Sequence, residues 1–111
     1  MRKRAVTKTV RVSPFKAREI TRLIQGKTVE EALALVDFAP QKAAGIIGKT
    51  LRSAIANAVN SGDGVEESDL TVAEAIVGEG PTMKRLRTKA RGMAGRIRKR
   101  TSHIRVVVTD E

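Results

Sequence analysis

The chain has 111 residues and a formal net charge of +10, so we expect one modest core and a polyanionic partner, either nucleic acid or an acidic membrane surface. It has no cysteine and one histidine, which excludes a disulfide framework and a Cys/His zinc cluster. No apolar run approaches the ~20 residues that cross a bilayer, and no signal peptide opens the chain, so we expect a cytoplasmic protein.

The first predicted elements are a strand and a helix. Val6, Val10 and Val12 alternate with polar residues, which predicts a strand with these valines on its buried face. Ser13 and Pro14 suit the cap and the first position of a helix that ends near Gly26. Its inward stripe should consist of Ala17, Ile20, Leu23 and Ile24.

Two further helices are expected in the middle of the chain. Thr28 and Glu31 have the spacing of a capping box, and the inward residues after the cap should be Val29, Ala32, Leu33 and Val36. A third helix should begin at Pro40 and run to about Asn60. Its inward residues should be Ala44, Ile47, Leu51, Ala54, Ile55 and Ala58. Within it, Gly45 and Gly48 indicate either close approach by another element or simple tolerance.

The rest of the chain contains an acidic segment and two strands. The acidic residues between Gly62 and Asp69 lack the ligand spacing of a calcium loop, so we expect a solvated loop and no bound metal. Residues 70–77 and 104–108 each alternate apolar and polar side chains, as strands do. These elements together predict an α+β fold.

Positive charge is concentrated at the two ends of the chain. Residues 1–27 hold nine basic side chains and one acid, residues 28–79 hold nine acids, and residues 80–109 hold ten basic side chains and no acid. A charge run is usually a solvated face or a tail, but the second run lies between two predicted strands. We therefore predict a single domain, residues 1–111, with a body (residues 1–79 and 104–111) and an arm (about 80–103).

The arm should be a β-hairpin that continues the pairing of the two strands flanking it. At about 3.3 Å per residue it would be roughly 35 Å long, with its turn near Arg91, Gly92 and Met93. Alternation would put basic groups on both faces of the ribbon, which suits insertion between nucleic-acid segments. The aromatic residues are Phe15 and Phe38 alone, which disfavours base stacking and favours recognition through phosphates, 2′-hydroxyls and shape.

Four segments, in order over nearly the whole chain, resemble the bacterial ribosomal protein L twenty-two family: SPFKAR (13–18), SAIANA (53–58), EGPTMKR (79–85) and KRTSHI (99–104). The resemblance implies three helices packed on a three-stranded antiparallel sheet, near the outer opening of the peptide exit tunnel. It also implies that the hairpin lines the tunnel, contacts several rRNA domains and approaches the hairpin of ribosomal protein L four. At the tip, Thr88, Lys89 and Met93 replace the usual Pro, Arg and second Arg.

The expected function is that of a non-enzymatic structural constituent of the large ribosomal subunit, which supports assembly without a cofactor and without forming a homo-oligomer. Its expected partners are rRNA, neighbouring ribosomal proteins and the nascent polypeptide, with no membrane. Residues expected to contact RNA are Arg2, Lys3, Arg4, Arg11, Lys16, Arg18, Lys84, Arg85, Arg87, Lys89, Arg91, Arg96, Arg98, Lys99, Arg100 and His103. Residues expected to line the tunnel at the tip are Thr88, Lys89, Ala90, Arg91, Gly92 and Met93.

Several of these residues also have a structural interpretation. Lys16 and Arg18 are of a kind common on exposed helix surfaces. The small residues 53–58 favour tight helix packing, with Asn57 hydrogen-bonded to a neighbouring strand or loop. His103 has no nucleophile or acid near it in sequence, so it is a hydrogen-bonding or RNA-contacting residue rather than a catalytic base.

Two other classes of function compete with this interpretation. A DNA-architectural protein can insert β-arms into the minor groove. Such arms usually carry an apolar or proline wedge at the tip, and in this sequence only Met93 could serve as one. An enzymatic function is the weaker alternative, because the sequence shows no phosphate-binding glycine loop, no metal constellation and no pair of a nucleophile and a base.

Overall fold

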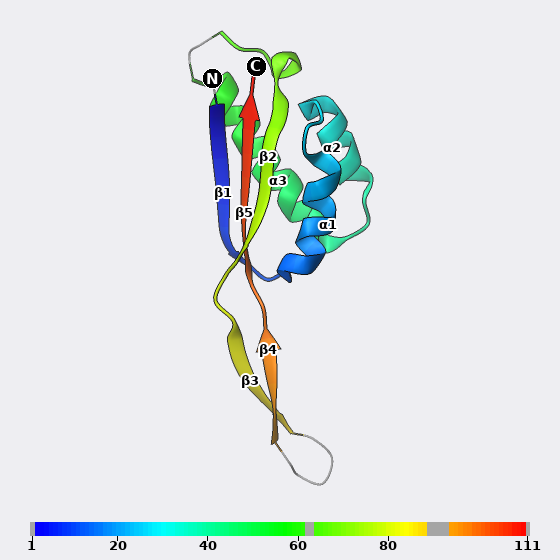
Figure 1. Ribbon diagram of the computed structural model, residues 1–111, viewed down its shortest axis with the longest axis vertical. Helices are drawn as coiled ribbons and strands as arrows, with labels where there is room; N and C mark the ends of the chain where they lie inside the picture. Colours follow the sequence, from blue (N-terminus) through cyan, green and yellow to red (C-terminus); the bar gives the residue numbers. More distant parts are fainter. Residues whose placement is uncertain (1, 62–63, 89–93, 111) are drawn as a thin grey trace.

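The computed structural model describes residues 2–61, 64–88 and 94–110, and for residues 83–88 and 94–99 it describes the backbone alone. The described elements are β1 (Arg2–Val10), α1 (Pro14–Ile24), α2 (Val29–Phe38), α3 (Lys42–Val59), η1 (Glu67–Asp69), β2 (Thr71–Glu79), β3 (Met83–Thr88), β4 (Ala94–Lys99) and β5 (Ser102–Thr109). They form a body from which a narrow two-stranded arm projects, with overall extents of 64 × 24 × 16 Å (Figure 1).

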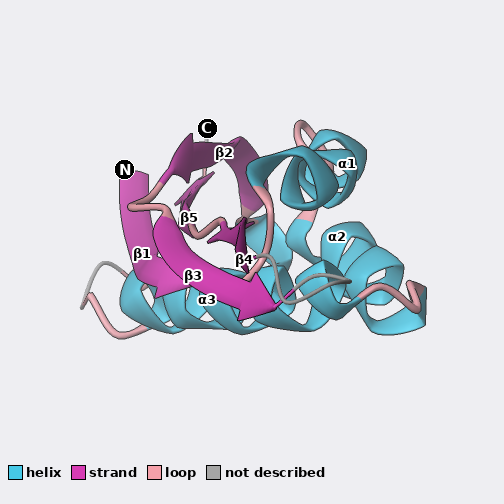
Figure 2. Ribbon diagram, turned by 90° about the horizontal axis from the view of Figure 1, so that it is seen from below, coloured by secondary structure: helices cyan, strands magenta, loops and turns pink. Residues whose placement is uncertain are grey.

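The body contains a three-stranded antiparallel sheet with β5 between β1 and β2. Helix α3 packs across β1 and β5, while α1 packs against β2 and α2 lies against both other helices (Figure 2). This arrangement confirms the predicted α+β fold of three helices on a three-stranded antiparallel sheet. Arg2 pairs with Thr109, so both ends of the described chain lie at the end of the body opposite the arm (Figure 1).

The first two helices begin where their capping residues predict. The Lys16 amide donates to Oγ of Ser13 over 3.4 Å, and the Glu31 amide donates to Oγ1 of Thr28 over 3.3 Å. Helix α3 begins at Lys42 rather than at the predicted Pro40, because Ala39, directly before the proline, and the cap residue Gln41 both have an extended backbone. In the described residues no helix is both long and apolar enough to cross a membrane.

The core is formed by the inward faces of the helices and the covered face of the sheet. All six apolar residues predicted to face inward from α3 are buried, and Leu51 is 0% exposed. The prediction for α1 is wrong at Leu23, which is 50% exposed, because Thr21 occupies the buried position instead. In α2, Val29, Ala32 and Val36 are buried as predicted, whereas Leu33 is only partly buried.

Strand β1 differs from the prediction because it contains a β-bulge. Thr7 pairs with Ile104 and Val10 pairs with Ser102, so β1 has one residue more than β5 between these pairs. Thr9 takes up this residue with a φ of +56°. The bulge reverses which side chains of the strand face the core. Val6, before the bulge, is therefore 43% exposed, whereas Val12, after the bulge, is buried.

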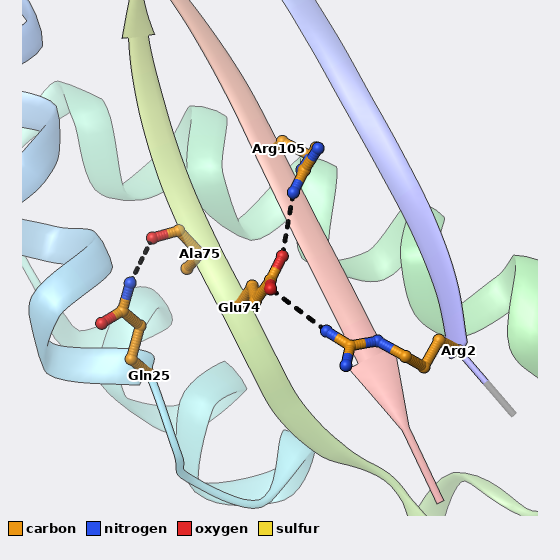
Figure 3. Close-up of polar contacts among 5 residues, drawn as sticks. All are labelled: Arg2, Gln25, Glu74, Ala75 and Arg105. Carbon is orange, nitrogen blue, oxygen red and sulfur yellow. Dashed lines mark hydrogen bonds and ion pairs between the residues drawn. The ribbon is translucent and has the colours of Figure 1, made fainter.

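A second bulge interrupts β2. Val72 pairs with Val108 but Glu74 pairs with Val107, which leaves Ala73 as the extra residue. Val72, Ala75 and Val77 are therefore all buried although their spacing is uneven. The bulge places Glu74 on the sheet face that the helices do not cover (Figure 3).

Close packing of α2 on α3 explains one of the two glycines in the third helix. A Cβ at Gly48 would lie 3.1 Å from Cγ2 of Val36, whereas a Cβ at Gly45 would meet no atom within 4 Å. Gly48 therefore allows close approach, and Gly45 is simply tolerated.

The arm is a separate two-stranded ribbon formed by β3 and β4, paired from Met83↔Lys99 to Thr88↔Ala94. The body sheet does not simply continue into it, contrary to the prediction. Glu79 pairs with Ser102 and Met83 with Lys99, which leaves three residues on one side of the junction and two on the other. Pro81 lies in the longer side and has no amide hydrogen with which to continue the ladder.

Candidate nucleic-acid interface

The described strands of the arm combine many basic residues with a fixed register. The strands hold Lys84, Arg85, Arg87, Arg96, Arg98 and Lys99. Every cross-strand pair from Met83↔Lys99 to Arg87↔Gly95 includes at least one lysine or arginine. The tip residues Lys89, Ala90, Arg91, Gly92 and Met93 lie outside the described residues, and Thr88 is the last described residue before them.

The junction between arm and body is held by short contacts. The Gly80 amide donates to the Thr101 carbonyl over 3.0 Å, and Oγ1 of Thr101 donates to the Pro81 carbonyl over 2.6 Å. A Cβ at Gly80 would lie 2.5 Å from Oγ1 of Thr101, so the junction has no room for a side chain there. Arg100, next to this junction, is exposed.

His103 has a defined structural role beside the junction. Its Nδ1 accepts a 2.9 Å hydrogen bond from the Thr9 amide, which the bulge leaves without a ladder partner. This contact confirms the hydrogen-bonding alternative for His103. The imidazole is partly exposed, so its other nitrogen can still serve an external acceptor.

A second group of predicted RNA-contacting residues lies close to the root of the arm. Arg11 and Lys16 are exposed and line one hollow of about 580 Å³ together with Lys42. Arg18 is only partly exposed, and its guanidinium donates to the Val77 carbonyl over 3.1 Å. Arg18 therefore ties α1 to β2, in addition to any contact with a ligand.

A third group, Arg2, Lys3 and Arg4, lies at the other end of β1, roughly 25 Å from Arg11 at ~3.3 Å per residue. The structure therefore does not bring the amino-terminal cations together with the group at the arm root. The side-chain amide of Asn57 in α3 donates to the Arg4 carbonyl over 3.0 Å, which confirms the structural prediction for Asn57.

Part of the charge at this far end is already paired within the protein. Glu74 accepts from Arg2 at 3.2 Å and from Arg105 at 2.9 Å, and Figure 3 shows its carboxylate between the two guanidiniums. Beside it, Nε2 of Gln25 donates to the Ala75 carbonyl over 2.5 Å and fixes the end of α1 to β2 (Figure 3). All three charged groups are partly exposed, so the ion pairs contribute little to stability.

Comparison with known proteins identifies the family to which this chain belongs. Residues 5–109 match the model of the family described as Ribosomal protein L22p/L17e. The chain belongs to this family. A relative from Halothermothrix orenii, named "Large ribosomal subunit protein uL22", is 57% identical over 111 residues, which cover 100% of this chain and 97% of the relative.

Membership of the uL22 family establishes the general role of the chain. It is a structural, non-enzymatic protein of the large ribosomal subunit, and it works in the cytoplasm as part of the ribosome. Within the described residues, no group of three or more His, Asp and Glu side chains is arranged to hold a metal ion.

The sequence analysis did not include Lys42 and Phe15 among the candidate interface residues. In the structure, both line the same hollow as Arg11 and Lys16. One signal was available in the sequence. Lys16 and Lys42 lie in the first turns of α1 and α3, which contain no acid, although cations are unfavourable at that end of the helix dipole. By contrast, α2 has Glu30 and Glu31 in its first turn.

Proposed function

We propose that this member of the uL22 family binds several domains of large-subunit rRNA, supports subunit assembly, and lines the polypeptide exit tunnel with its arm. The observation that carries the proposal is the two-stranded ribbon of β3 and β4, which projects from the body and holds six basic residues and no acid. The chain acts as a single domain and as a single copy. Its partners are rRNA, the nascent polypeptide and neighbouring ribosomal proteins, including the L four family at the tunnel.

The physics of the arm supports a polyanionic ligand. An isolated two-stranded ribbon is marginally stable in water, and repulsion between closely spaced cations destabilises it further. Phosphates of folded rRNA remove this repulsion and release counterions at the same time. The arm is therefore best stabilised when RNA surrounds it.

The body provides the second part of the proposed interface. Arg11 and Lys16 are exposed near the arm root, and Arg100 is exposed at the junction itself. Exposed cations therefore extend from the arm onto the body, where they outnumber the exposed acids Glu19 and Glu79 near the arm root. Arg2 and Arg18 also belong to the proposed interface, because a guanidinium has five N–H donors and each uses only some of them within the protein.

Competition binding tests the choice of nucleic acid. A labelled transcript of large-subunit rRNA bound to the full chain is challenged with unlabelled transcript or with duplex DNA at equal phosphate concentration. The proposal expects the folded rRNA to compete much better than the duplex. Equal competition by duplex DNA would favour the DNA-architectural alternative.

Deletion of residues 87–94 separates the arm tip from the body. The deletion leaves the described core and the helix caps in place, so subunits should still incorporate the shortened protein. The tunnel should change in width, which alters sensitivity to macrolides or stalling by particular nascent peptides. Incorporation that is abolished by tip deletion would contradict this division between body and arm.

A further inference from the structure

The hollow between the amino-terminal ends of α1 and α3 has an unusual combination of charge and apolar surface. Its charged lining consists of Arg11, Lys16 and Lys42 against the single acid Glu19. The side chain of Phe15 lies among these cations and is 73% exposed. The volume of about 580 Å³ is within the range of small-molecule sites.

The backbone that supports the hollow is fixed from three directions. Nζ of Lys42 donates to the Arg11 carbonyl over 3.4 Å, and Oγ of Ser102 donates to the Val12 carbonyl over 2.5 Å. Ser13 then caps α1 two residues before Phe15. The backbone that carries the lining side chains is therefore fixed before any ligand binds, which reduces the entropic cost of binding.

Exposure of Phe15 alone would mean little, because single apolar residues are common on protein surfaces. Phe38 provides the comparison: it is 91% exposed, follows Asp37, and is not among the residues that line this hollow. What distinguishes Phe15 is that an apolar ring and three cations line the same hollow. A ligand that matches both features carries a flat apolar face beside negative charge.

A nucleotide has this combination of properties, since its base offers a π-face and its flanking phosphates carry the charge. A base inside a helix is already stacked on both sides, so the matching ligand is a nucleotide that is unpaired. A protein partner would have to supply acidic groups around an apolar side chain, whereas RNA supplies both features with every nucleotide. The position next to Ser102, where β5 leaves the arm, adjoins the proposed RNA path.

We propose that this hollow binds one unpaired ribonucleotide of the large-subunit rRNA, with its base stacked on Phe15 and its flanking phosphates near Arg11, Lys16 and Lys42. The inference rests on the proposed rRNA binding and adds a specific contact to it. It also modifies the expectation from the low aromatic content that base stacking is disfavoured. The basic residues still contribute most of the affinity, and stacking of one base on the ring of Phe15 adds to it.

The test compares aromatic variants of the full chain in binding to a transcript of large-subunit rRNA over a range of salt concentrations. Phe15→Ala should weaken binding roughly five- to tenfold at every salt concentration, which is the low end for removal of one stacked base. The slope against salt should stay unchanged, because the variant keeps every cation that neutralises a phosphate. Phe15→Trp should retain the affinity, and Phe38→Ala should behave as the wild type.

Ultraviolet crosslinking of the wild-type complex, followed by mass spectrometry, provides a second measurement. It should recover the peptide containing Phe15 bonded to a nucleotide that is unpaired in the rRNA. Unchanged binding by Phe15→Ala, an equal weakening in Phe38→Ala, or a crosslink to a paired nucleotide would each overturn the inference. If the wild type itself failed to bind rRNA, the proposed function would be wrong as well, so the two failures are distinguishable.

Discussion

The amide of Thr9 donates a 2.9 Å hydrogen bond to Nδ1 of His103, at the place where β1 has one residue more than β5. The two residues are 94 positions apart in sequence, and the bond satisfies an amide that the bulge removes from the sheet ladder. The bulge in turn directs Val10 and Val12 toward the body. The contact therefore fixes the geometry of β1 close to the arm.

Because Thr9 has a left-handed backbone, replacing it by Gly should give a more stable protein than replacing it by Ala, which is the reverse of the usual order in a strand. Ala is ordinarily better than Gly within a strand by about 0.5–1 kcal/mol. At Thr9, with φ of +56°, Gly should instead be more stable than Ala by about 1 kcal/mol, since a Cβ is strained in this region. Urea unfolding of both variants measures the difference. At Lys8, whose φ is not positive, the ordinary order should hold; the same order at both positions would contradict the description of the bulge.

Leu51 should be a major determinant of the stability of the body. Its side chain is 0% exposed on α3, so Leu51→Ala should lower the free energy of unfolding by about 2–5 kcal/mol. Leu23→Ala is a matched control, because this leucine is 50% exposed and should cost about 1 kcal/mol at most. Chemical denaturation measures both values. Similar decreases for the two variants would mean that the core is not where the structure places it.

The two glycines of α3 should respond differently to alanine. Gly45→Ala should raise the free energy of unfolding by about 1 kcal/mol, because helix propensity improves and no atom lies within 4 Å of the new Cβ. Gly48→Ala should gain less or lose stability, because its Cβ would lie 3.1 Å from Val36. The shift in denaturation midpoint decides the matter, and an equal gain at both positions would argue against tight packing of α2 on α3.

Local sequence signals predicted the helices well, because the capping residues and the apolar period act within a few residues. Ser13 and Thr28 cap as expected, and the predicted stripe of α3 is buried throughout. The errors arise from contacts between distant parts of the chain. Val6 is exposed because of a bulge stabilised by His103, and Leu23 is exposed because the packing of α1 favours Thr21.

The candidate interface shows the same limit of local reasoning. The charge of the arm is visible in the sequence, but its separation from the body sheet depends on the junction around Pro81. The acid-free first turns of α1 and α3 mark Lys16 and Lys42 as unusual, but they do not show that the two helix ends meet in one hollow. Lys42 lies 31 residues from Arg11 and reaches it only through the packing of α3 beside β1. The sequence spacing of these residues contains no trace of that proximity.

Removal of charge at the arm root should change the salt dependence of RNA binding. Replacing Lys99 and Arg100 together by Ala should reduce the slope of log affinity against log salt by about 0.7–0.9 for each phosphate that is no longer neutralised. The control replaces Lys27 and Lys49 by Ala, which removes the same net charge from exposed body positions outside the proposed interface. Filter binding from low to high salt gives both slopes. Equal slopes for the two double variants would mean that net charge, and not position, controls binding.

A density map of the large ribosomal subunit that contains this chain tests the central claim most directly. The proposal predicts that β3 and β4 lie between rRNA segments, that the tip reaches the wall of the exit tunnel, and that the three-stranded sheet and its helices remain near the outer opening. A map in which the arm projects into solvent, or lies away from the tunnel, would contradict it.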